Sequence, residues 1–128
     1  MTARGPAQRH ILVVDDDPIV CETVHMLLEF DGHVVADASS GAEALNRFEP
    51  GKFDVVFTDY LMPEMKGDEL VAAIKQRSPA QPVVMLTAYP EKLKDVRVDF
   101  LLGKPFEINE LRETLERCAP VRKLESSV

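Results

Sequence analysis

The sequence predicts an α/β fold, a single doubly wound sheet of five parallel strands with helices on both faces. Strand-like runs alternate with helix-like periods through about a hundred central residues, which is typical of βαβ units. The first run, 11–14, is continuously apolar, as expected of a strand covered on both faces. Crossovers are right-handed and must cover both faces of the sheet, so these elements fit one open sheet.

The remaining strands are short apolar runs bounded by turn-forming residues. The expected strands are 11–14, 33–38, 53–58, 83–86 and 98–102. The first helix has Asp17 as its N-cap and Pro18 at its first position, and it ends at Asp31-Gly32. Ser40 and Glu43 form a possible capping box for the second helix.

Apolar stripes mark the later helices. The third helix carries Leu70, Val71 and Ile74 and ends before Pro79, and the last helix carries Leu111 and Leu115 on one face. We expect one domain over residues 10–118, a flexible N-terminal tail over 1–9 and a C-terminal tail over 119–128.

Composition narrows the function. The chain has 128 residues and a formal net charge of −7, which disfavours direct nucleic-acid binding. No run approaches the ~20 apolar residues of a membrane span, and no signal peptide is evident. We therefore expect a cytoplasmic protein with no membrane insertion. Cys21 and Cys118 lack metal-site spacing, so we expect them to be buried and reduced.

Polar side chains follow four of the five predicted strands. They are Asp15, Asp16 and Asp17 after the first strand, Asp59 after the third, Thr87 after the fourth and Lys104 after the fifth. Each alone is typical of a turn or a helix cap. The carboxyl ends of parallel strands meet at one edge of a sheet, so we expect these groups to lie together.

This combination predicts a phosphoryl acceptor. Clustered carboxylates repel one another unless a cation lies among them, and carboxylate oxygens suit Mg²⁺. Asp59 can then act as a carboxylate nucleophile that forms an aspartyl phosphate. The metal and Lys104 would neutralise phosphoryl charge, while the Thr87 hydroxyl would bond a phosphoryl oxygen.

Four segments, in order, resemble the receiver domains of two-component response regulators. They are 11–18 (ILVVDDDP), 59–67 (DYLMPEMKG), Thr87-Ala88 and 104–106 (KPF). The resemblance covers roughly residues 10–118. It implies a flavodoxin-like sheet with strand order 2-1-3-4-5 and a stand-alone, chemotaxis-Y-like signalling protein with no external substrate.

The resemblance also implies roles for individual residues. Asp59 would take a phosphoryl group from the phosphohistidine of a sensor histidine kinase or a histidine phosphotransfer protein, and would thereby switch the binding of an unknown downstream protein. Mg²⁺ would be held by Asp15, Asp16, Asp59 and the backbone carbonyl of Leu61. Thr87 would be the switch hydroxyl and Lys104 the phosphate-pairing ammonium, with a cis peptide bond between Lys104 and Pro105.

The chain departs from the family in two places. Seventeen positions separate Thr87 from Lys104 (104 − 87), about one helical turn fewer than usual. The fourth helix should therefore be shortened, and we expect one helical turn or an irregular loop, more mobile than the other crossovers, over 88–97. Leu101 stands where the family often has an aromatic residue, so the usual threonine–aromatic coupling is not predicted.

Three other functions are alternatives to this one. A phosphohydrolase of the haloacid dehalogenase kind needs its nucleophile on the first strand, followed by glycine and Ser/Thr, but here Pro18-Ile19 follows Asp17. A flavodoxin-like cofactor binder needs a phosphate loop where this chain is acidic. An interaction module that is never phosphorylated remains the alternative. His10, His25 and His33 do not cluster, and we expect structural or surface roles for them.

Overall fold

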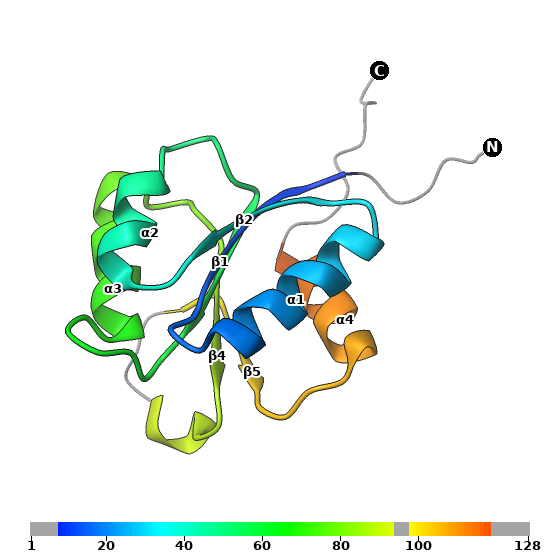
Figure 1. Cartoon of the computed structure of the whole chain (residues 1–128). Coiled ribbons are helices and arrows are strands. Elements are labelled where there is room, and N and C mark those ends of the chain that lie inside the picture. The colour runs from blue at the N-terminus through cyan, green and yellow to red at the C-terminus, as the bar shows by residue number, and fades with distance from the viewer. Residues whose placement is uncertain (1–7, 94–97, 119–128) are drawn as a thin grey trace.

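A computed structural model describes residues 8–93 and 98–118, and within them a central parallel sheet is covered by helices on both faces (Figure 1). The strands are β1 His10–Val14, β2 Val34–Ala38, β3 Val55–Asp59, β4 Val83–Thr87 and β5 Phe100–Gly103. Their order in the sheet is β2-β1-β3-β4-β5, and every neighbouring pair is parallel. The predicted fold class and strand order are confirmed.

The helices form two layers. They are α1 Pro18–Phe30, α2 Gly41–Arg47, α3 Gly67–Arg77 and α4 Ile108–Cys118, with a short 3₁₀ helix, η1, at Pro90–Leu93. Helices α1 and α4 cover one face of the sheet, and α2 and α3 cover the other (Figure 1). Parallel strands joined by helices that lie on both faces form a doubly wound sheet.

Two apolar cores lie on the two faces of the sheet. Leu12 and Val14 pack in the core beneath α2 and α3, whereas Ile11 and Val13 pack in the core beneath α1 and α4. All four side chains are fully buried, because successive residues of a strand point to opposite faces. The continuous apolar run of β1 therefore reflects burial on both sides, as the sequence predicts.

Local chemistry fixes the ends of α1. The Asp17 Oδ1 atom accepts a hydrogen bond of 3.0 Å from the Ile19 amide, and Pro18 is the first helical residue, so the predicted N-cap is confirmed. The helix ends at Phe30 with Asp31 as its C-cap, and Gly32 follows with φ of +94°. That left-handed conformation favours glycine, because a Cβ would be strained there.

The second helix shows half of the predicted capping box. Ser40 Oγ accepts from the Glu43 amide at 3.1 Å. The Glu43 carboxylate, however, accepts from the amide and the hydroxyl of Ser39, at 2.7 and 3.0 Å. These hydrogen bonds lower the pKa of Glu43, and the bond from the Ser39 amide has the largest effect. A capping box would have the Ser40 amide donate to the Glu43 carboxylate, but here the Ser39 amide is the donor.

Asp99 explains why β5 begins at Phe100, two residues later than predicted. Its Oδ2 atom accepts from the Val83 amide at 2.7 Å and from Lys75 Nζ at 2.8 Å. A side chain thus satisfies a backbone donor at the start of β4, in the place where a strand would supply a carbonyl. In the described part of the β4–β5 connection the helix is the four-residue η1, and residues 94–97 lie outside the described residues.

The packed region extends one residue beyond the predicted boundary. Arg9 is buried, its amide donates to His33 Nδ1 at 3.1 Å, and its guanidinium lies 3.0 Å from Glu116 Oε2 on α4. Residues 1–7 and 119–128 of the predicted tails lie outside the described residues. Among the residues that are described, no helix is both long enough and apolar enough to cross a membrane.

His25 links α1 to β2 through two carboxylates. Its Nδ1 atom lies 2.6 Å from Asp37 Oδ1 on β2, and its Nε2 atom lies 3.0 Å from Glu29 Oε2 one turn along α1. Burial lowers the pKa of His25, but the hydrogen bonds and charges of Glu29 and Asp37 outweigh it, so the pKa is raised. The protonated ring can donate to both acids.

We predict that His25→Gln lowers the free energy of unfolding more at acidic than at alkaline pH. The stabilisation is fully present below the ordinary histidine pKa of about 6.5 and is lost as pH rises through the raised folded-state pKa. Since both acids are partly exposed, the loss near pH 6 should not exceed about 1 kcal/mol. Urea unfolding near pH 6 and at alkaline pH measures the loss of unfolding free energy. His10→Gln, at an exposed position, is the control. Equal losses at both pH values would contradict the prediction.

Candidate functional site

The predicted polar residues meet at the carboxyl edge of the sheet. Asp15 and Asp16 follow β1, Asp59 ends β3, Thr87 ends β4 and Lys104 follows β5. Strands β1, β3, β4 and β5 are consecutive neighbours in the sheet, so their carboxyl ends lie side by side. The strand order therefore brings together residues that are up to 89 positions apart in the chain.

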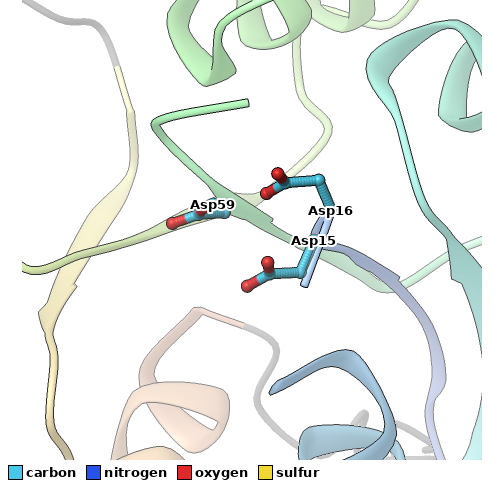
Figure 2. Close-up of side chains that lie close together, drawn as sticks. All are labelled: Asp15, Asp16 and Asp59. Atoms are coloured by element: carbon cyan, nitrogen blue, oxygen red, sulfur yellow. The ribbon is translucent and has the colours of Figure 1, made fainter. Parts of the chain in front are cut away.

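Three carboxylates form the centre of the site (Figure 2). An oxygen from each of Asp15, Asp16 and Asp59 lies within 4.8 Å of the others. Asp15 and Asp59 are buried, with 1% and 9% of their surface exposed, whereas Asp16 is exposed. Figure 2 shows all three carboxylates directed to the same side of the strand ends. The site is a compact set of hard oxygen donors that opens to solvent at Asp16.

Asp15 is held from three directions. Its amide donates to the Ala38 carbonyl at 3.1 Å, its Oδ1 accepts from the Asp17 amide at 2.9 Å, and its Oδ2 accepts from Lys104 Nζ at 3.2 Å. Burial raises the pKa of Asp15, and the charge of Asp59 adds to this, while the Asp17 amide and Lys104 lower it; the net direction is upward. The folded site therefore disfavours charge on Asp15 without a further cation.

Lys104 bridges the two buried carboxylates. Its Nζ atom lies 3.0 Å from Asp59 Oδ1 and 3.2 Å from Asp15 Oδ2. Burial lowers the pKa of Lys104. The hydrogen bond to Asp59 and the charges of Asp15 and Asp59 outweigh burial, so the pKa is raised. The ammonium therefore stays charged at neutral pH. Its peptide bond to Pro105 is cis, as the resemblance predicts.

Thr87 contacts the lysine through the backbone. The Lys104 amide donates to the Thr87 carbonyl at 2.7 Å, and the buried Thr87 hydroxyl accepts from the Tyr89 amide at 3.0 Å. Leu61, two residues after Asp59, has a half-exposed side chain. Asp17 caps α1 and does not belong to the carboxylate group, in agreement with its predicted N-cap role.

The donor set fits a magnesium ion. Mg²⁺ prefers oxygen ligands and is usually held by one or two carboxylates together with water or phosphate. Three carboxylates face one bridging ammonium here, so negative charge exceeds positive charge among these four groups. A divalent cation would offset that excess, and the exposed Asp16 leaves the site open to it.

Residues 11–116 match the family model described as "Response regulator receiver domain". The chain belongs to this family. Among its relatives is the transcriptional regulatory protein ZraR of Escherichia coli K12, which is 41% identical over 114 residues covering 84% of this chain and 26% of ZraR. GlrR of the same strain is also 41% identical, over 87% of this chain and 27% of GlrR. The receiver domain thus spans about a quarter of these relatives.

Solved structures agree with this assignment. The chemotaxis protein CheY4 of Vibrio cholerae superposes with a TM-score of 0.79 and 34% identity, covering 88% of this chain and 99% of CheY4. The response regulator TrrA of Thermotoga maritima, solved with Mg²⁺ and BeF, has a TM-score of 0.80 and 32% identity, covering 86% and 98%. Receiver domains are signalling domains, and the phosphohydrolase and cofactor-binder alternatives are not supported.

Gly67 contributes to the site in a way that the sequence analysis missed. Its amide donates to the Tyr60 carbonyl at 2.7 Å. A Cβ at this position would lie 2.8 Å from Met85 Sδ and 2.9 Å from Tyr60 Cα, and closer still to the Asp59 carbonyl oxygen. The start of α3 can therefore approach the end of β3 only with glycine. The available signal was a glycine at a helix start soon after a functional strand end.

We predict that Lys104→Met lowers the free energy of unfolding by roughly 2 kcal/mol in metal-free buffer, because it leaves buried carboxylate oxygens without their hydrogen-bond donor. Adding Asp15→Asn should recover part of that loss, since one of the two charges is then removed. Urea unfolding of the two single variants and the double variant measures the coupling. Lys52→Met, on the exposed surface, is the control. A loss no larger than that of Lys52→Met would contradict the prediction.

Proposed function

We propose that this receiver domain accepts a phosphoryl group on Asp59 in a reaction that depends on Mg²⁺. The observation that carries the proposal is the Lys104 ammonium in contact with Asp59 and Asp15, beside a third carboxylate. The donor would be the phosphohistidine of a sensor histidine kinase or of a histidine phosphotransfer protein. We propose a switch protein with no external substrate and no direct contact with nucleic acid.

In the transfer, a carboxylate oxygen of Asp59 forms a bond to phosphorus as the nitrogen–phosphorus bond of the donor breaks. The bonding electron pair leaves with the donor imidazole. Lys104, already 3.0 Å from Asp59 Oδ1, would pair with a phosphoryl oxygen, and the Thr87 hydroxyl would bond another. Preorganised charges of this kind stabilise the transition state without rearrangement.

Asp15, Asp16, Asp59 and the Leu61 carbonyl would hold the metal. When bound, Mg²⁺ supplies positive charge that offsets the charge of the transferred group. The contact between the Asp17 amide and Asp15 Oδ1 would orient Asp15 toward the metal, because it fixes one of the two carboxylate oxygens. The complex of TrrA with Mg²⁺ and BeF supports this assignment by similarity.

Thr87 and Lys104 would couple the site to a partner surface. The Lys104 amide donates to the Thr87 carbonyl at 2.7 Å, so displacement of either residue strains a bond to the other. Leu101 is 40% exposed on β5. Because the helix in the described part of the β4–β5 connection has only four residues, we expect the downstream partner to contact the loop after Asp59 or α1.

We predict that a small acyl-phosphate donor phosphorylates Asp59, and only when Mg²⁺ is present. Intact-mass analysis should show one added phosphoryl group in the parent protein and none in Asp59→Asn. Asp54→Asn is the matched control, because Asp54 precedes β3 at the opposite end and bonds the His10 amide; it should be labelled like the parent. Unchanged labelling of Asp59→Asn would refute the assignment.

A second prediction concerns Asp16. Asp16→Ala should bind Mg²⁺ much more weakly than the parent, yet unfold at no lower temperature in metal-free buffer, because removing one crowded carboxylate relieves repulsion. Calorimetric titration with MgCl₂ and thermal unfolding without metal measure the two effects. If Mg²⁺ affinity were unchanged, Asp16 would not be a ligand.

A further inference from the structure

The loop between β3 and α3 carries the Leu61 carbonyl, and its two ends are fixed. It begins at Asp59, and it ends at Gly67, whose amide bonds Tyr60. Within the loop, the Met65 amide donates to the Pro63 carbonyl at 2.7 Å, and Glu64 has φ of +71°. A non-glycine residue in that region is uncommon, and with both ends fixed a displacement of one loop residue would also move its neighbours.

Met65 packs directly against Gly41, the first residue of α2. A Cβ at Gly41 would lie 2.5 Å from Met65 Sδ, 2.9 Å from its Cγ and 3.0 Å from its Cβ. Rotation of the methionine side chain could move its sulfur away, but its own Cβ is fixed to the backbone. Room for a methyl group at Gly41 would therefore require the backbone of the loop to move.

Helix α2 is the less movable partner of this contact. Its first turn is capped by Ser40, and Glu43 bonds Ser39. Ala44, one turn on, is fully buried in the core beneath α2 and α3. Movement of α2 would break these contacts, so a larger residue at Gly41 would displace the loop instead.

We propose that Gly41 is a positioning residue for the Mg²⁺ site and that it acts through Met65. The Gly41–Met65 contact sets the distance between the β3–α3 loop and the start of α2. It thereby sets the position of the Leu61 carbonyl relative to Asp59. The inference rests on the proposed function, because it concerns the same metal site. The three atoms nearest to a Cβ at Gly41 all belong to Met65, which is not one of the proposed metal ligands.

The test measures Mg²⁺ affinity by calorimetric titration with MgCl₂ in the absence of any phosphodonor. Gly41→Ala should weaken Mg²⁺ binding by roughly tenfold, which is the lower end of the range for losing a residue that supports a metal ligand without binding the metal itself. Met65→Ala should weaken it by less than Gly41→Ala does, because the loop loses its support without being displaced. The double variant should resemble Met65→Ala alone, since the small side chain makes room for the new methyl group.

Gly32→Ala controls for a general loss of stability. Gly32 follows α1 with φ of +94°, and a Cβ there would have no neighbour within 4 Å, so the substitution strains the backbone away from the site. Its Mg²⁺ affinity should equal that of the parent. Parental affinity in Gly41→Ala, or additive losses in the double variant, would overturn the inference.

The outcomes also separate the inference from the proposed function. If the parent bound no Mg²⁺, the proposed metal site would fail together with the inference. If the parent bound Mg²⁺ and Asp16→Ala did not, but Gly41→Ala bound it normally, only the positioning role would fail. Should Gly41→Ala not fold, parental affinity in Met65→Ala would be sufficient to overturn the inference.

Discussion

The balance between the clustered carboxylates and Lys104 is the constraint on which the rest of the structure depends. Two buried acids lie beside one ammonium, and a third acid lies within 4.8 Å. Such a cluster is stable only if the backbone brings the cation to it. The strand order β2-β1-β3-β4-β5 does so, because it sets β5, which leads to Lys104, on the side of β3 opposite β1. The apolar cores on both faces hold those strands in place.

Much of this arrangement could be predicted from the sequence because it depends on local patterns. A continuous apolar run followed by acids marks a buried parallel strand with a functional end, and Asp17 before Pro18 marks a helix start. The resemblance then supplied the strand order and the residue roles. The position of Asp59, Thr87 and Lys104 at one edge follows from the topology once the strands are recognised.

The remaining features depend on contacts between distant residues, which local patterns do not reveal. Arg9 looked like part of a tail, but it is buried against α4. His25 has no partner that the sequence pattern indicates, yet it contacts both Glu29 on α1 and Asp37 on β2. The packing of Met65 against Gly41 requires the loop after β3 to reach the start of α2. Each of these pairings is set by how the elements approach in three dimensions.

The same charge balance links the stability of the fold to the chemistry of the site. Burial and the charge of Asp59 raise the pKa of Asp15, and Lys104 offsets only part of that, so the metal-free site carries an electrostatic cost. A cation that binds only the folded protein recovers this cost by mass action. A phosphoryl group on Asp59 would add further negative charge, which Lys104 and a divalent cation would together offset. Metal binding and phosphorylation would then be coupled through shared charge, and this coupling does not depend on a threonine–aromatic movement.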